Sequence, residues 1–104
     1  MMIEILFFDG CPNHESTMNL AREVLSELGL EAEIREVPVE TPEEAQTHRF
    51  LGSPTVRVNG RDIEPDARAR TDFGLCCRMY ERGGVPPKEL LVDALREERR
   101  RRLP

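Results

Sequence analysis

Apolar side chains recur along this chain with two periods, one typical of strands and one typical of helices. Residues 3–8 form a nearly continuous apolar run that ends at an Asp-Gly pair, which predicts a parallel central strand buried on both faces. From residue 18 to residue 28 the apolar positions recur every three or four residues, which predicts an amphipathic helix. Gly29 fits the end of that helix, and Pro12 fits its first turn.

A second strand and a second helix are predicted next. Residues 31–39 alternate weakly and indicate a strand near a sheet edge. A capping box follows, with Thr41 as the N-cap, Pro42 at the first helical position and Glu44 reaching back to the cap amide. We expect a short helix from there to about Leu51.

Two further strands are predicted in the second half of the chain. Residues 55–58 alternate up to an Asn-Gly turn at residues 59–60, as in a hairpin. Residues 61–72 are polar and irregular, and residues 73–80 then favour a fourth strand. Alternation would divide its side chains between two faces, with Leu75, Cys77 and Met79 on one and Cys76, Arg78 and Tyr80 on the other.

A last helix is predicted after the Pro-Pro pair at residues 86–87, with an apolar stripe made of Leu90, Leu91, Ala94 and Leu95. It leads into a basic tail at about residues 99–104. The predicted order is strand, helix, strand, helix, strand, strand, helix. The first two strands should be parallel and the later pair antiparallel, so we expect one α/β domain over residues 1–104.

Composition narrows the functional classes. The chain has 104 residues, 38% hydrophobic and 34% charged, which is enough for one core but not for two. A formal charge of -5 argues against general nucleic-acid binding, which needs clustered Lys and Arg. No apolar stretch approaches the ~20 residues of a membrane span, and the N-terminus lacks the features of a secretory signal. We therefore expect a cytoplasmic protein with no nucleic-acid or membrane partner.

The three cysteines, Cys11, Cys76 and Cys77, form an odd set that favours free thiols with reactive or metal-binding roles. Cys11 is the strongest candidate, because the N-terminal amides and dipole of the first predicted helix would stabilise its thiolate. A buried structural thiol is the alternative. His14 lies one helical turn further on. Its ring could pair with the Cys11 thiolate or accept the thiol proton, and a surface position without a function is the alternative.

Two landmarks, Cys11-Pro12 directly after the first strand and Ser53-Pro54-Thr55 directly before the third, resemble the thioredoxin and glutaredoxin superfamily over nearly the whole chain. The resemblance implies a thioredoxin-like fold, in which helices flank a central four-stranded mixed sheet. It also implies a cis bond before Pro54 and places Ser53, Pro54 and Thr55 beside Cys11. These three residues and Pro12 would contact the substrate, and no cofactor is expected.

The motif departs from that family in one respect. The family usually has Cys-x-x-Cys, or Cys-x-x-Ser in monothiol glutaredoxins, whereas this chain has His14 at the last of these positions. Three segments also look like small bacterial thioredoxin-like proteins without a settled activity, some of them encoded beside mercury-resistance genes. These segments are Gly10 to Asn13, Gly52 to Thr55, and Phe73 to Arg78.

Three functions fit these residues. In a thiol-dependent redox protein, Cys11 would attack a protein disulfide or an oxidised thiol, and Cys76, Cys77 or a low-molecular-weight thiol would resolve the mixed disulfide, although Cys77 also fits a core position. This would be a thiol-disulfide oxidoreductase without the usual second cysteine. A non-enzymatic binder of a soft metal or an organomercurial would use Cys11 with Cys77 or Cys76, and His14 as an extra ligand. A redox-inert interaction domain is the third function. The exposed sheet edge at the second strand is compatible with a monomer or a homodimer.

Overall fold

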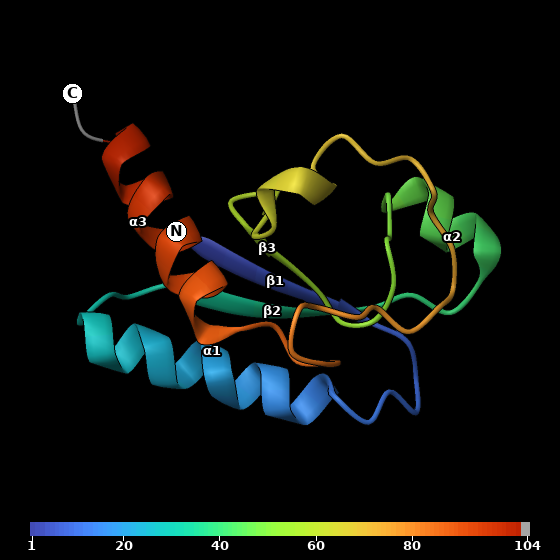
Figure 1. The fold of residues 1–104 in the computed structure, drawn as a ribbon, viewed down its shortest axis with the longest axis horizontal. Helices are drawn as coiled ribbons and strands as arrows, with labels where there is room; N and C mark the ends of the chain where they lie inside the picture. Colours follow the sequence, from blue (N-terminus) through green and yellow to red (C-terminus); the bar gives the residue numbers. More distant parts are fainter. Residues whose placement is uncertain (103–104) are drawn as a thin grey trace.

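The computed structural model describes residues 1–102 and is built on a four-stranded sheet in the order β2-β1-β3-β4 (Figure 1). The strands are β1 (Met2–Phe7), β2 (Glu33–Pro38), β3 (Thr55–Val58) and β4 (Arg61–Asp62). Strand β2 pairs with β1 in parallel, whereas β3 pairs with β1, and β4 with β3, in antiparallel fashion. The mixed sheet, its central first strand and its second strand at an edge are as predicted.

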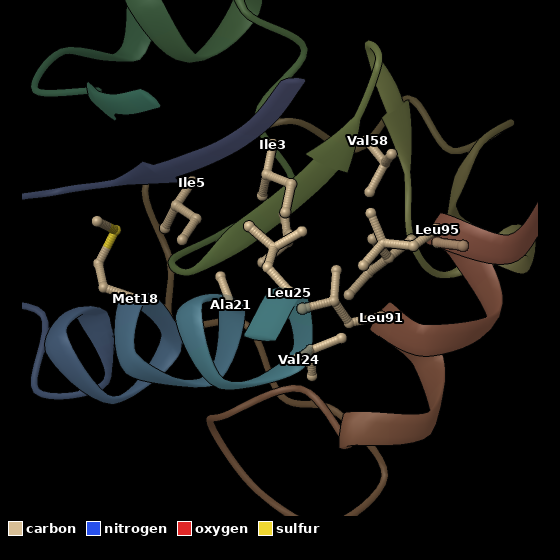
Figure 2. Close-up of a cluster of buried hydrophobic side chains, with 12 residues drawn as sticks. Ile3, Ile5, Met18, Ala21, Val24, Leu25, Val58, Leu91 and Leu95 are labelled. Carbon is tan, nitrogen blue, oxygen red and sulfur yellow. The ribbon is translucent and has the colours of Figure 1, made fainter. Parts of the chain in front are cut away.

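The larger core lies between one face of this sheet and two long helices, α1 (His14–Leu28) and α3 (Lys88–Arg102) (Figures 1 and 2). Strand side chains alternate between faces, so every second residue of β1 and β3 points into this core. The buried side chains that meet there are Ile3, Ile5, Met18, Ala21, Val24, Leu25, Val56, Val58, Ile63, Leu91, Ala94 and Leu95. Their burial is the main source of stability for the fold.

The opposite face of the sheet has a much smaller apolar core. It carries α2 (Pro42–Thr47), a helix of only 6 residues, and a cluster made of Leu6, Val39, Ala45 and Phe50. In Figure 1 the rest of the chain on the α2 side is mostly irregular, including the long segment that follows the 3-10 turn at Pro65–Ala67. The two faces of the sheet therefore differ in the size of the apolar core that packs against them.

Local signals place most element ends where the sequence predicts them. Gly29 caps α1 in the left-handed conformation, with φ of 63°. Asn59 and Gly60 also have positive φ, 50° and 83°, and so form the tight turn that joins β3 to β4. Thr41 caps α2 by accepting a hydrogen bond from the Glu44 amide at 3.1 Å.

Several predicted details are wrong by one to four residues. The Glu44 carboxylate accepts from the amide of Glu40, not from that of the cap residue. Helix α2 ends at Thr47 rather than near Leu51. Pro12 lies outside α1, because the cap of that helix is Asn13 and the helix begins one residue later.

The largest error concerns the fourth strand, which is Arg61–Asp62 and not residues 73–80. The turn at residues 59–60 folds the chain directly back onto β3, so the edge position is filled at once. Residues 73–80 are irregular, apart from isolated bridges at Cys77 and Tyr80. Burial alternates only over residues 78–80, where Arg78 and Tyr80 are buried and Met79 is 69% exposed. Cys76, predicted on the same face as Arg78 and Tyr80, is exposed.

The C-terminal arginines, residues 99–102, form the exposed last turn of α3, and residues 103–104 of the predicted basic tail lie outside the described residues. Among residues 1–102, no helix has both the length and the apolar character needed to cross a membrane.

A candidate thiol site at the cis-proline loop

Cys11 lies in the loop between β1 and α1, two residues before the N-cap of the helix. Its amide donates to the carbonyl of Phe8 at 3.2 Å, and its carbonyl accepts from the amide of His14 at 3.4 Å. The side chain is a free thiol and half-buried. The Asn13 side chain makes no capping hydrogen bond, so side-chain capping does not neutralise the positive end of the α1 dipole close to this thiol.

The loop before β3 has the predicted cis bond between Ser53 and Pro54. Ser53, Pro54 and Thr55 are all buried. The Thr55 hydroxyl donates to the carbonyl of Gly52 at 2.6 Å, which closes the loop on itself. This cis-proline loop is therefore a well-ordered element that other parts of the chain can pack against.

A long irregular segment, residues 74–84, packs across this loop, and we call it the docked segment. The amide of Ser53 donates to the carbonyl of Cys76 at 2.8 Å, and the amide of Arg78 donates to the carbonyl of Ser53 at 2.9 Å. Both backbone groups of Ser53 are thus used within the chain. In this structure they are therefore not free to pair with the backbone of an extended substrate.

Gly52 makes this close approach possible. Its φ is 119°, and a Cβ there would lie 3.0 Å from Arg78 Cβ and 3.1 Å from the Cys76 carbonyl oxygen. Those distances are shorter than ordinary packing contacts, and the backbone conformation suits only glycine. The docked segment and the cis-proline loop are therefore fitted to each other at this residue.

Arg78 anchors the docked segment, although the sequence assigned it no role. It is only 3% exposed, and its guanidinium forms two hydrogen bonds to the Asp62 carboxylate, at 2.7 and 2.9 Å. Further bonds reach Glu64 at 3.0 Å and the Thr55 hydroxyl at 3.2 Å. Burial alone would lower the pKa of Arg78, but the bonds to Asp62 and Glu64 raise it above its ordinary value. The arginine stays charged in its buried position.

Tyr80 adds a second attachment to the same loop. Its hydroxyl donates to the carbonyl of Pro54 at 2.6 Å, and its ring lies 4.7 Å from the guanidinium carbon of Arg78. Burial raises the pKa of Tyr80, so the hydroxyl keeps its proton for this bond. At the far end, Gly84 packs against Asn13 so closely that a Cβ would clash with that side chain. The docked segment thus runs from the cis-proline loop to Asn13, two residues after Cys11 in the chain.

Cys76 and Cys77 are both exposed free thiols on the docked segment. Cys77 is therefore not a core residue, and it lies in bridge register with Ser53. The Cys76 sulfur lies 3.8 Å from the carbonyl of Leu51, a weak contact. The structure places this pair of thiols beside the cis-proline loop, on an irregular segment rather than on the predicted strand. Their role in resolving a mixed disulfide stays a prediction.

His14 has partners other than the thiol. Its ring stacks on Phe7 with 3.6 Å between centroids and 10° between planes. Its Nε2 is buried and lies 3.4 Å from Glu36 Oε1, with an alignment too poor for a hydrogen bond. Its hydrogen bond to Cys11 runs through the backbone. His14 therefore packs against Phe7 of β1 and lies near Glu36 of β2. Direct pairing of its ring with the Cys11 thiolate stays a prediction.

Within residues 1–102, no group of three or more His, Cys, Asp and Glu side chains is arranged to hold a metal ion. Cys11, His14 and a second thiol are therefore not gathered into a three-ligand site. A two-thiolate site for a soft metal, made of Cys11 and Cys77, stays a prediction.

A thioredoxin domain family model matches residues 1–62, which is more than half of the chain. The chain therefore belongs to the thioredoxin domain family, and its four-stranded mixed sheet with flanking helices is a thioredoxin-like fold. A search of the curated proteins found no significant match. The matched region contains Cys11 and the cis-proline loop, whereas the docked segment lies outside it.

Proposed function

We propose that this protein is a thiol-dependent redox protein that exchanges disulfides through Cys11. The observation that carries the proposal is the docked segment, which pairs with Ser53 at one end and packs on Asn13 at the other. The Asn13 end of this segment lies two residues from Cys11 in the chain, and the segment carries two exposed thiols. Those thiols would take the place of the second cysteine that the Cys-Pro-Asn-His motif lacks.

The chemistry is a two-step exchange. The Cys11 thiolate attacks one sulfur of a disulfide R–S–S–R, forming a Cys11–S–S–R bond and releasing one RS⁻, which takes up a proton. A thiolate from Cys76 or Cys77 then attacks the Cys11 sulfur and releases the second RS⁻. The substrate disulfide is reduced by two electrons to two thiols, and the protein dithiol is oxidised to an intrachain disulfide. Two molecules of a second low-molecular-weight thiol would restore the reduced protein by the same exchange and leave as a disulfide.

The site favours a small disulfide over an extended protein segment. An extended peptide gains affinity mainly by pairing its backbone with free N–H and C=O groups. Here both groups of Ser53 already bond to Cys76 and Arg78. A peptide would have to displace the docked segment and its buried Arg78, whereas a small disulfide only has to reach the half-buried thiol.

The proposal is tested by mapping the products of one turnover. Reduced protein is mixed with an equimolar amount of glutathione disulfide, quenched in acid and analysed by peptide mass spectrometry. We expect a disulfide between Cys11 and Cys76 or Cys77, with two glutathiones released. The double variant Cys76→Ser, Cys77→Ser should stop at a glutathione adduct on Cys11, and Cys11→Ser should form neither product. Equal consumption of the disulfide by wild type and Cys11→Ser would overturn the proposal.

A redox-inert interaction domain is the second candidate, and the occupied backbone of Ser53 is the observation that favours it. An inert domain should leave glutathione disulfide intact in the same experiment. It should also show no difference between wild type and Cys11→Ser.

A further inference from the structure

A cavity of about 220 Å³ opens on the sheet face that carries α2, beside β3 and β4. Val56 and Val58 point into the core under α1, so Arg57 between them points to this other face. Five of the lining residues are arginines and one is aromatic: Arg49, Arg57, Arg61, Arg68, Arg70 and Phe73. In a chain with a formal charge of -5, such a cluster of cations is a local feature and not a consequence of composition.

Three of these arginines already have carboxylate partners. Arg61 and Arg68 both contact Glu97, at 3.0 and 3.2 Å, and Arg70 contacts Asp72 at 2.7 Å. Arg49 and Arg57 differ, because neither forms an ion pair with any residue in the range 1–102. The cavity therefore has two cations whose charge the protein leaves unpaired.

Arg57 is held in place without being neutralised. It is half-buried, and its Nη2 donates to the carbonyl of Arg49 at 2.7 Å. Burial lowers the pKa of Arg57, which reflects the cost of placing this charge away from water. Two acidic residues lie opposite Arg57 in the strand pairing, Glu4 on β1 and Asp62 on β4, and both raise its pKa without forming an ion pair with it. Both oxygens of the Asp62 carboxylate bond to Arg78. An anion bound in the cavity would supply the missing counter-charge.

Arg49 is also positioned by its surroundings. Its backbone has φ of 54°, a conformation that is uncommon for a residue with a side chain. Its guanidinium lies over the ring of Phe73, with 5.1 Å from the guanidinium carbon to the ring centroid. The same residue thus offers its carbonyl to Arg57 and its cation to the space next to Phe73.

We propose that this cavity binds a small molecule carrying a phosphate-type oxyanion, with Arg57 and Arg49 as the residues that recognise it. Arginine suits this role because its planar guanidinium donates paired hydrogen bonds to phosphate or carboxylate oxygens. The volume of about 220 Å³ is far above what one water needs and below the range typical of drug-sized ligands. It fits a phosphate group with a few carbon atoms, and Phe73 and Leu51 supply an apolar wall.

The test is an NMR titration of ¹⁵N-labelled protein at low ionic strength, with inorganic phosphate in one arm and glycerol 3-phosphate in the other. The backbone amides of Gly60, Ala67 and Phe73 should shift and saturate, and added salt should weaken the binding. Tighter binding of glycerol 3-phosphate would indicate that the organic part is also recognised. Equal binding would indicate that the oxyanion alone is sufficient. No saturable shift with either probe at ~10 mM would overturn the proposal.

Three variants make the result specific. Arg57→Gln and Arg49→Gln should each weaken binding about tenfold, because each removes one charged donor from the oxyanion. Arg49 is exposed, so that variant should keep the fold even if the half-buried Arg57 does not tolerate change. Arg35→Gln is the matched control, since it removes an exposed arginine from β2 that is paired with Glu33. Equal weakening by Arg35→Gln would contradict the site, whereas Cys11→Ser should bind as the wild type does.

Discussion

The part of the chain matched by the family model, residues 1–62, and the part that follows it are held by different forces. In residues 1–62, strands pair in register and bury a dense set of aliphatic side chains under α1. No residue of the docked segment, 74–84, belongs to either apolar cluster, and the segment is held by the buried Arg78, by Tyr80 and by backbone bonds to Ser53. Its exposed residues include Leu75, at 40%, and Met79.

The aliphatic core therefore stabilises the fold, whereas polar contacts hold the docked segment at the candidate site. Loss of an aliphatic core contact should weaken the whole sheet, because the core is shared by α1, β1, β3 and α3. Loss of a polar anchor should release the docked segment first, because irregular segments held by few contacts open locally at low cost. Four substitutions test this separation.

The largest effect is expected for Arg78→Met. It leaves the Asp62 carboxylate, in a residue only 7% exposed, without its main partner. Removing one member of a buried ion pair costs about 3–5 kcal/mol. Urea unfolding should show that loss, and hydrogen exchange should show the Ser53 amide opening before the amides of β1. Arg82→Met is the control, since it removes an exposed pair with Glu89 and should change stability by less than about 1 kcal/mol.

Ile5→Ala tests the aliphatic core of the family-matched region. Ile5 is fully buried between the sheet and α1, and such a truncation costs roughly 2–5 kcal/mol through lost burial and a cavity. Unfolding should stay a single transition at lower urea concentration, with the docked segment and β1 losing protection together. Ile34→Ala, on the edge strand β2, is half-buried and should cost less. Opening of the docked segment alone in Ile5→Ala would contradict the separation.

Gly52→Ala should have an intermediate effect that is confined to the site. The added methyl group forces an unfavourable φ and crowds Arg78 and Cys76, for a cost of about 1–3 kcal/mol. Thermal unfolding and exchange at the Arg78 amide would measure the change. Gly74→Ala is a matched control, because a Cβ at Gly74 meets no atom within 4 Å. The same loss in both variants would mean that the close fit at Gly52 has no special role.

The smallest effect is expected for Thr41→Ala, which removes the N-cap of α2. The lost bond to the Glu44 amide should cost about 1 kcal/mol in urea unfolding. Thr47→Ala, at the end of the same helix and exposed, serves as the reference. Unchanged stability of Thr41→Ala would show that the cap contributes nothing.

The sequence predicts most of the family-matched region because its signals are local. The apolar run of β1, the glycine that ends α1 and the Asn-Gly turn after β3 each act over a few residues. The position of Cys11 before α1 follows from the order of the predicted elements, and the cis bond at Pro54 follows from the resemblance.

Local sequence signals do not predict the structure of the later part of the chain. A strand of only 2 residues, β4, is too short to show any periodicity, and the alternation of residues 73–80 is equally compatible with a strand. The anchoring of Arg78 depends on Asp62, which is 16 residues away, so no local pattern indicates it. The arginines of the cavity are likewise spread over four separate segments, and only the fold brings them together.

The central claim, that Cys11 is the reactive thiol, is tested most directly by the relative alkylation rates of the three cysteines at pH 7. Exposure alone favours Cys76 and Cys77, because both are exposed while Cys11 is half-buried. A reactive Cys11 should reverse that order, because alkylation requires the thiolate form. Labelling of reduced protein with limiting iodoacetamide, followed by peptide mass spectrometry, should find Cys11 modified first. Modification of Cys76 and Cys77 with Cys11 left untouched would contradict the account.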